Sequence, residues 1–301
     1  MRNILRRAAA VLAAGGLAGL AVTSSAASAG ASTMGHSARH CVQVRASGTT
    51  VTVSRTVIRA GLACFAVSTA NPGQPGGGGG SSVSLFRPVH GVSLAQLLRD
   101  AKDEFSSKPA TAAKGTRELN RNGLFYGLAM VVAGHPETVT ENLRPGTYWL
   151  GDIGGTIGAG KPVQLVRLTV LPGGSARFLQ GDVLVKATSA DRFIAPRAWP
   201  HRGAYLFANV ADTIHFMQIT PVKDGTTDAE IQAFFNSGSQ AAPPFAKAGP
   251  FGGNDVVSPG HIIRVSYDLP RGTYVLLCFI ADDVTGMPHA IMGMHLVIKL
   301  K

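Results

Sequence analysis

Apolar and polar residues alternate over short stretches along most of this chain, which is the period-2 pattern of half-buried β-strands. In the first half the pattern predicts strands at 42–44, 49–57, 62–68, 83–86, 124–132, 138–143, 147–152 and 163–171. In the second half it predicts strands at 177–186, 203–210, 214–221, 262–269, 273–279 and 290–300. Turn residues, mainly Gly, Pro and Asn, separate these runs. The sequence therefore predicts an all-β protein.

Two stretches have helical spacing instead. Residues 92–105 carry an apolar stripe behind a Ser-x-x-Gln capping box, and residues 228–235 follow a capping box made by Thr227 and Glu230. Three other stretches are expected to be loops because they are polar or rich in Gly and Pro, at 71–82, 107–122 and 237–260. We therefore expect one short helix in each half.

The order of elements repeats between the two halves of the chain. Residues 134–150 align with residues 260–276 at a constant offset of 126, and eight aligned positions are identical, Tyr148 and Tyr274 among them. A repeat of this length favours the duplication of one β-rich unit. We predict a first unit at 42–172 and a second at 175–301.

The N-terminus has the pattern of an export signal. Three arginines precede an apolar stretch at 8–22, and a small-residue cleavage site ends at Ala29. The pair Arg6-Arg7 leaves a twin-arginine route open beside the general one. We predict a signal peptide at 1–29, a disordered leader at 30–41 and a secreted or cell-wall-associated protein. No later apolar run is long enough to span a membrane.

Charge limits the classes of partner. The 28 Lys and Arg residues outnumber the 17 Asp and Glu residues, which gives a net charge of +11. Loss of the three N-terminal arginines lowers that charge to +8. A basic surface favours an anionic cell-wall polymer or an acidic redox protein as partner. The basic residues are scattered rather than clustered, so nucleic acid is not expected.

Three cysteines are an odd number for an exported protein. Cys41 and Cys64 belong to neighbouring predicted strands, and we expect them to form a disulfide because export favours oxidation. Cys278 is then unpaired and liable to oxidation unless something protects it. Ligation of a metal would give that protection.

The residues around Cys278 form a recognisable pattern. A predicted strand ends at Cys278, a loop returns with His289, and Gly293 and Met294 close the loop. This segment resembles the C-terminal signature of the cupredoxins, and the stretch from Asn209 to His215 resembles their first-ligand segment. The resemblance covers 175–301 directly and 42–172 by way of the repeat. Ten residues separate Cys278 from His289, which is more than in the small single-domain members.

The resemblance implies a fold and a metal site. The fold is two tandem Greek-key β-sandwiches. The site is a type 1 copper centre, with the Cys278 thiolate, His215 and His289 in one plane and Met294 as the axial ligand. Such a ligand set suits both Cu(I) and Cu(II), which implies single-electron transfer or copper holding. In the first half Asp152 aligns with Cys278 and Ser82 with His215, so that unit is expected to be degenerate and metal-free.

A second reading stays open. Each of the four residues has an ordinary structural role, since buried Cys and Met are common in cores. The chain would then be a metal-free secreted β-sandwich that binds a protein or a wall polymer. Under either reading we do not expect an enzyme, because none of the nine His forms the His-x-His pairs that supply further coppers in multicopper oxidases.

Overall fold

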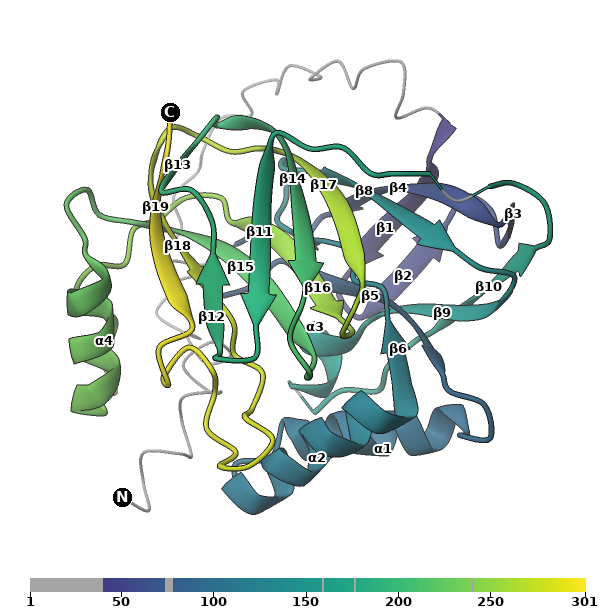
Figure 1. Ribbon diagram of the computed structural model, residues 1–301, viewed down its shortest axis with the longest axis horizontal. Helices are drawn as coiled ribbons and strands as arrows, with labels where there is room; N and C mark the ends of the chain where they lie inside the picture. The colour runs from purple at the N-terminus through teal and green to yellow at the C-terminus, as the bar shows by residue number, and fades with distance from the viewer. Residues whose placement is uncertain (1–39, 74–77, 159, 176, 240) are drawn as a thin grey trace, which may run out of the picture.

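The computed structural model describes residues 40–301, apart from 74–77, 159, 176 and 240 (Figure 1). The predicted signal peptide at 1–29 and nearly all of the predicted leader at 30–41 lie outside the described residues. Within the described part, strands dominate and pack face to face as sheets. The predicted all-β sandwich class is confirmed.

The first half contains strands and helices in the order of a sandwich with helical insertions. Its strands are β1 (Val42–Ser47), β2 (Thr50–Val53), β3 (Val57–Arg59), β4 (Gly61–Thr69), β5 (Ser81–Pro88), β6 (Gly123–Phe125), β7 (Met130–Val131), β8 (Glu137–Leu143), β9 (Gly146–Asp152) and β10 (Val166–Leu171). Its helices are α1 (Leu94–Glu104), α2 (Pro109–Asn122) and the short α3 (Ile153–Ile157).

The second half has fewer insertions. Its strands are β11 (Val183–Thr188), β12 (Arg192–Ile194), β13 (Ala198–Trp199), β14 (Arg202–Asn209), β15 (His215–Val222), β16 (Gly252–Val257), β17 (Ile262–Asp268), β18 (Gly272–Leu277) and β19 (His295–Leu300). Its helix is α4 (Asp228–Ser237), which opens with the predicted capping box of Thr227 and Glu230.

The two halves share one pattern of strand pairing. In the first, β1 pairs with β2 and β4, and β4 pairs with β8; in the second, β11 pairs with β12 and β14, and β14 pairs with β17. The facing sheets correspond too, with orders β3-β10-β9-β5-β6 and β13-β19-β18-β15-β16. Tyr148 in β9 and Tyr274 in β18 are equivalent, and their hydroxyls donate to the carbonyls of Arg144 and Pro270.

One sheet runs through both halves. Its eight strands have the order β12-β11-β14-β17-β8-β4-β1-β2, and the halves meet where β17 pairs antiparallel with β8. In that pair Val139 lies opposite Val265, which is its own counterpart in the repeat. The β8–β17 pairing, here called the seam, therefore relates the two halves by a local two-fold axis. Each half covers the other's exposed sheet edge with the equivalent strand.

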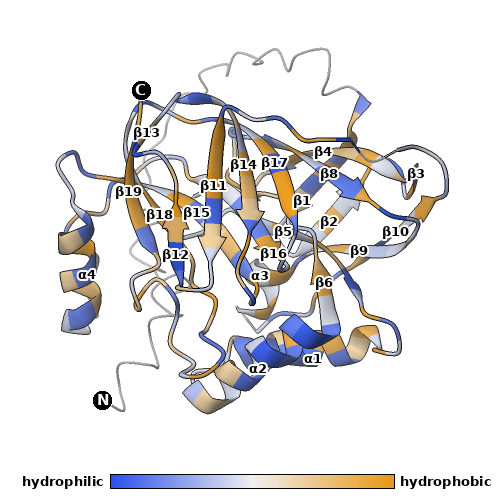
Figure 2. Ribbon diagram, in the orientation of Figure 1, coloured by the Kyte–Doolittle hydropathy of each residue, from blue (hydrophilic) through white to orange (hydrophobic). Residues whose placement is uncertain are grey.

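The core follows from the alternation that predicted the strands. In β1 and β11, for example, every second residue is buried, and apolar side chains occupy those positions (Figure 2). The largest side chains that are fully buried include Trp199, Tyr148 and Tyr205. Burial of each such side chain contributes about 1.5–3 kcal/mol. One continuous apolar cluster extends through both sandwiches.

The predicted loop at 107–122 is wrong, because Pro109–Asn122 forms α2. Proline at the first turn favours a helix start, and the buried face is made of small residues with a single large one, Leu119. That face is too weakly apolar to produce a clear helical pattern. The first half therefore carries more than the one expected helix, and α1 and α2 pack against each other below the sheets (Figure 1).

Other boundaries differ from the predictions as well; for example, the expected strand at 49–57 is divided into β2 and β3. The expected loop at 237–260 contains β16, which pairs with β15. The expected strand at 177–186 begins only at Val183, and the one at 124–132 is divided into β6 and β7. The expected strand at 290–300 begins at His295, because the residues before it belong to the turn that ends the loop after Cys278.

A disulfide joins Cys41 to Cys64, with a Cα–Cα distance of 4.6 Å. Cys64 lies in β4, and Cys41 directly precedes β1, which runs parallel to β4. The bond therefore anchors the first strand of the sandwich at its N-terminal end. Cys278 is the free cysteine of the described chain and is buried.

Candidate metal centre

Cys278 lies directly after β18, a strand held between β15 and β19. Its side chain is fully buried, and the backbone N–H groups of Phe216 and Ile280 donate to its sulfur. Burial raises the pKa of the Cys278 thiol to about 12. The thiol is therefore protonated at neutral pH, unless a cation replaces its proton.

His215 opens β15 and reaches the thiol from the neighbouring strand. Its Nδ1 atom lies 3.7 Å from Cys278 Sγ, and the ring is fully buried. Asn209 fixes the segment before it, because its side-chain amide donates to the carbonyls of Thr213 and Val257. The register of β15 against β16 shifts just after His215, which is the mark of a β-bulge that re-aims a side chain.

His289 approaches from the loop that follows β18. Its Nδ1 atom also lies 3.7 Å from Cys278 Sγ, and its ring centroid is 4.8 Å from that of His215. Backbone hydrogen bonds shape the loop, since His289 N–H donates to Ile280 O and Ala290 N–H donates to Cys278 O. The structure thus brings together three of the four predicted ligands, from two adjacent strands and one loop.

The two imidazoles are in the state that a metal requires. Burial, together with the neighbouring ring of His289, lowers the pKa of His215 to about 3. Burial likewise lowers the pKa of His289 to about 4. Both rings are therefore neutral at pH 7, and each has one unprotonated nitrogen to donate.

The spacing fits a trigonal plane. Bonds of about 2.0 Å to nitrogen and about 2.3 Å to sulfur, set 120° apart, place the N and S atoms about 3.7 Å from each other. Both observed N···S separations are 3.7 Å. The donor atoms of His215, Cys278 and His289 all lie within 4.8 Å of one another. Two neutral imidazoles and a thiol form a soft N/S set of the kind that holds copper or zinc.

Met294 lies at the end of the same loop. It is fully buried, belongs to the same apolar cluster as Cys278, and donates its backbone N–H to His289 O. Its position five residues after His289 places it between the ligand loop and β19. A methionine thioether is the kind of group that serves as a weak donor to copper.

Asp191 is a neighbour that the sequence analysis missed. Its Oδ1 atom lies 3.6 Å from His289 Nε2 and 3.9 Å from His215 Nε2. It lies in the turn between β11 and β12, about 90 residues before the ligand loop. An Asp in a hairpin turn is common for local reasons, so nothing in the sequence pattern indicated this contact.

The matching place in the first half has different chemistry. The strand registers align Ser81 with His215, so the predicted alignment of Ser82 is wrong by one residue. Asp152 stands at the position of Cys278 and accepts hydrogen bonds from the backbone N–H groups of Ser82 and Gly155. Neither Ser81 nor Asp152 offers a nitrogen or sulfur donor, and burial raises the pKa of Asp152 to about 6.

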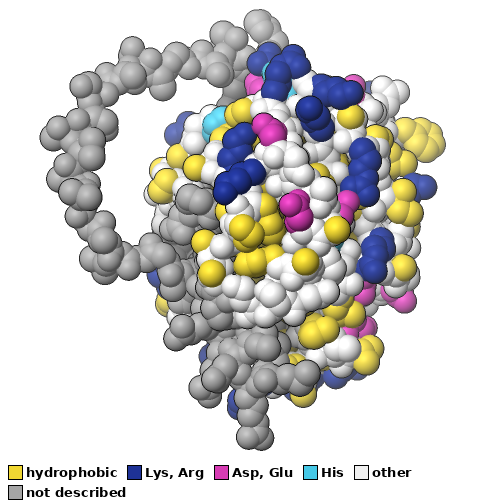
Figure 3. Space-filling view, turned by 90° about the vertical axis from the view of Figure 1, so that its left-hand side faces the viewer, with side chains coloured by type: hydrophobic (Ala, Val, Ile, Leu, Met, Phe, Trp, Pro, Cys, Tyr) yellow, Lys and Arg dark blue, Asp and Glu magenta, His cyan; other side chains and the backbone are white. Residues whose placement is uncertain are grey.

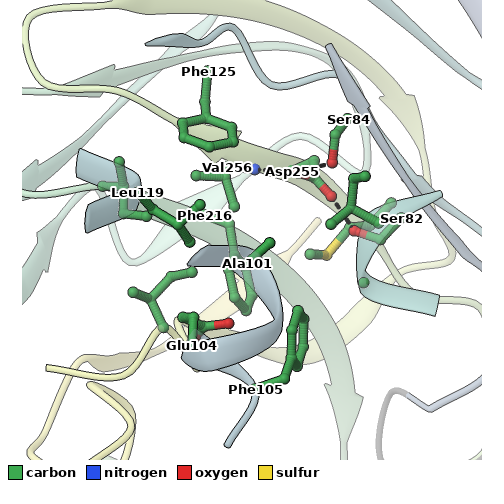
Figure 4. A pocket seen from close by; sticks show the side chains of 15 residues that line it. Ser82, Ser84, Ala101, Glu104, Phe105, Leu119, Phe125, Phe216, Asp255 and Val256 are labelled. Atoms are coloured by element: carbon green, nitrogen blue, oxygen red, sulfur yellow. Dashed lines mark hydrogen bonds between the residues drawn. The ribbon is translucent and has the colours of Figure 1, made fainter. Parts of the chain in front are cut away.

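A cavity of about 180 Å³ lies between the halves and next to the cluster (Figure 4). Phe216 and Ile280, whose amides hold the Cys278 sulfur, line it. Its polar groups are the carboxyls of Glu104 and Asp255, the latter bonded to the hydroxyls of Ser82 and Ser84. The rest of the lining is mostly apolar.

No family model and no curated protein matches the sequence. Among solved structures, an auracyanin from Roseiflexus castenholzii is 18% identical and covers 39% of this chain and 94% of its own, at a TM-score of 0.25. A copper-containing nitrite reductase from Thermus scotoductus is 11% identical and covers 86% of this chain and 61% of its own, at 0.21. A multicopper oxidase is 11% identical and covers 86% of this chain and 87% of its own, at 0.22.

Since these TM-scores are all below 0.5, the fold and the candidate centre rest on this chain's own strand pairing and side-chain geometry. None of the helices in the described part of the chain is long and apolar enough to cross a membrane. What the geometry gives is a buried Cys/His/His cluster, placed at one end of the second sandwich, with spacing suited to a small soft cation.

Proposed function

We propose that this chain is an exported copper-binding protein built from two tandem cupredoxin-like units, at 42–172 and 175–301. The second unit holds one type 1 copper through His215, Cys278 and His289, with Met294 as the axial ligand. The first unit is degenerate and binds no metal. The observation that carries the proposal is the pair of equal 3.7 Å separations between the Nδ1 atoms and the sulfur.

Each residue has a defined task in this centre. Cys278 loses its thiol proton on binding, and the N–H groups of Phe216 and Ile280 stabilise the resulting negative charge on sulfur. His215 and His289 donate from Nδ1 without first losing a proton, because both are neutral. Copper held by such a set would supply one-electron chemistry between Cu(I) and Cu(II), because these donors suit both oxidation states. Single-electron transfer or copper holding is the function that follows.

We expect no enzyme activity, and we expect an anionic partner. Lys and Arg side chains are spread over the face shown in Figure 3 rather than gathered in one patch. Such a surface suits weak electrostatic association with an acidic redox protein or a cell-wall polymer. On the described part of this face the Lys and Arg side chains do not line a single basic groove of the kind that tracks a nucleic-acid backbone.

Copper addition tests the proposal. Titration of the purified, metal-free protein with Cu(II) is expected to give an intense visible charge-transfer absorption that saturates at one equivalent. Cys278→Ser removes the thiolate that donates electron density to the metal, so this band is expected to vanish. His90→Gln is the matched control, because it removes an exposed imidazole far along the chain from the cluster. If the native protein stays colourless and binds no copper, the metal-free binding module becomes the better account.

A further inference from the structure

The outward nitrogens of both imidazoles lack a hydrogen-bond partner among the described residues. His215 and His289 direct Nδ1 towards the sulfur, and the Nε2 atom of each is buried and unpaired. A neutral imidazole carries one proton. If Nδ1 is free to donate to a metal, that proton is on Nε2, and a buried N–H without an acceptor is costly. Each ring therefore needs an acceptor on its outer side.

Asp191 is the group placed to supply that acceptor. A single carboxylate oxygen, Oδ1, lies 3.6 Å from one Nε2 atom and 3.9 Å from the other. A shift of about 0.6 Å would bring Oδ1 to ordinary hydrogen-bond distance from His289. A carboxylate oxygen has lone pairs enough for two donors. No described residue donates a hydrogen bond to the Asp191 side chain. The turn therefore leaves the carboxylate oxygens of Asp191 free to accept hydrogen bonds from the two rings.

The backbone at Asp191 is unusual as well. Its φ of 49° is the only positive value at a non-glycine residue in the described part of the chain. Asp adopts this left-handed conformation at some cost, and glycine is the residue that such a turn favours. The conformation directs the carboxylate from the β11–β12 turn over both rings. Arg192, the next residue, holds the turn against the ligand loop by donating to the carbonyl of Met292.

Binding of a second cation is the alternative role for Asp191 and its neighbours. Asp191, Asp282 and His289 together form a possible cation-binding group. However, Asp282 Oδ1 already accepts the backbone N–H groups of Val284 and Thr285. In addition, His289 would have to lose its one remaining ring N–H proton to bind one cation through each nitrogen. A carboxylate that accepts N–H from a metal-binding imidazole is the ordinary arrangement.

We propose that Asp191 is a positioning residue whose carboxylate accepts the Nε2–H of both His215 and His289. It thereby fixes both rings in the tautomer that leaves Nδ1 facing the Cys278 sulfur, and it places a negative charge behind the two imidazoles. The role of that charge rests on the proposed copper function, whereas the tautomer is a property of the metal-free chain.

Two variants separate this role from a role in the turn. Asp191→Gly removes the acceptor and Asp191→Asn keeps one oxygen without the charge, and both residues accept a φ of 49°. In the metal-free protein with ¹⁵N-labelled histidine, NMR is expected to show His215 and His289 as Nε2–H tautomers with slowly exchanging protons. Asp191→Gly is expected to lose that slow exchange or to mix the tautomers. Unchanged tautomers and exchange in Asp191→Gly would overturn the proposal.

Copper affinity and reduction potential then measure the effect of losing the Asp191 carboxylate. Asp191→Gly is expected to weaken copper binding about ten- to hundredfold, as losses of such outer partners do, and to raise the reduction potential. Asp191→Asn is expected to raise the potential with a smaller loss of affinity. Asp212→Asn is the control, since it removes an exposed negative charge near Asp191 without touching the rings. An equal rise in potential for Asp212→Asn would overturn the contact role.

The two proposals fail in different ways. If the native protein binds no copper, the NMR comparison still decides whether Asp191 holds the rings. Uptake of a second divalent cation per chain, lost in Asp191→Asn, would overturn the hydrogen-bond role in favour of a cation site at Asp191 and Asp282.

Discussion

At the scale of single residues, protonation decides what the cluster can bind. Burial holds the Cys278 thiol protonated and the two imidazoles neutral at pH 7. The thiol is the one donor of the three that must give up a proton to a metal, so metal uptake releases about one proton per chain. Acid competes weakly for the imidazoles, because their pKa values lie near 3 and 4.

Met294 allows a test of the axial position. Met294→Leu is a volume-conserving change at a fully buried site, so the fold is expected to tolerate it at a cost below about 1.5 kcal/mol. The copper–thiolate colour should persist while the reduction potential rises, because only a weak donor to Cu(II) is lost. Visible spectroscopy and voltammetry measure the two effects. Met287→Leu, at a more exposed methionine of the same loop, serves as control. Loss of colour in Met294→Leu alone would contradict an axial role.

At the scale of elements, α1 and α2 both bond to the ligand loop. Ala281, three residues after Cys278, donates its N–H to Glu104 Oε1, and its carbonyl accepts from Thr116 Oγ1 at 2.8 Å. Arg117 also donates to the carbonyl of Asp283. The longer loop between Cys278 and His289 is therefore supported by helices of the first half. These contacts tie the loop that carries His289 to the first half.

Thr116→Val tests that support. The two side chains have nearly the same shape, but valine leaves the buried carbonyl of Ala281 without its partner. The free energy of unfolding is expected to fall by about 1–3 kcal/mol. Chemical denaturation measures the change, with Thr111→Val on the more accessible side of α2 as the matched control. Equal stabilities of Thr116→Val and the native protein would show that the hydrogen bond contributes nothing.

At the scale of the whole molecule, buried carboxyl groups accept hydrogen bonds from residues of the opposite half. Glu104 accepts from Ala281, Glu137 accepts from the N–H of Gly253, and Asp255 accepts from the hydroxyls of Ser82 and Ser84. Burial raises the pKa of all three, to about 7 for Glu104. The interface between the halves is thus most stable while these groups are protonated.

The raised pKa of Glu104 predicts how the stability of Glu104→Gln, relative to the native protein, changes with pH. The folded pKa of Glu104, about 7, lies above the ordinary value of 4.5, so its contribution is full below pH 4.5 and is lost as pH rises through 7. Glutamine keeps the acceptor for Ala281 and never ionises. Glu104→Gln should therefore match the native stability near pH 4 and exceed it near pH 8 by about 3 kcal/mol.

Denaturation at both pH values measures the difference. Asp103→Asn, whose carboxyl is 40% exposed on the same helix, is the control and should show no such gain. A Glu104→Gln variant that is no more stable than the native protein at pH 8 would contradict the raised pKa.

The prediction of the fold from sequence succeeded where side chains alternate, and failed where packing partners lie far away in the chain. β-Strand periodicity and the 126-residue repeat are local patterns, so the sandwich class and the matching of Tyr148 to Tyr274 could be read directly. Helix α2 could not be predicted in this way, because its buried face consists mostly of small residues and gives no clear apolar stripe in the sequence. The seam between β8 and β17 was likewise invisible, since it joins strands about 125 residues apart.

The same division holds for the candidate centre. The donor types and their order could be read from the chain, because Cys278, His289 and Met294 belong to one loop and its adjoining strand ends, which keeps them close. The folded arrangement was needed to show that both Nδ1 atoms lie 3.7 Å from the sulfur and that Asp191 lies behind the rings. Those distances depend on strand register, on a bulge after His215 and on helices of the other half. Each of these is set by burial across the whole molecule rather than by neighbours in the chain.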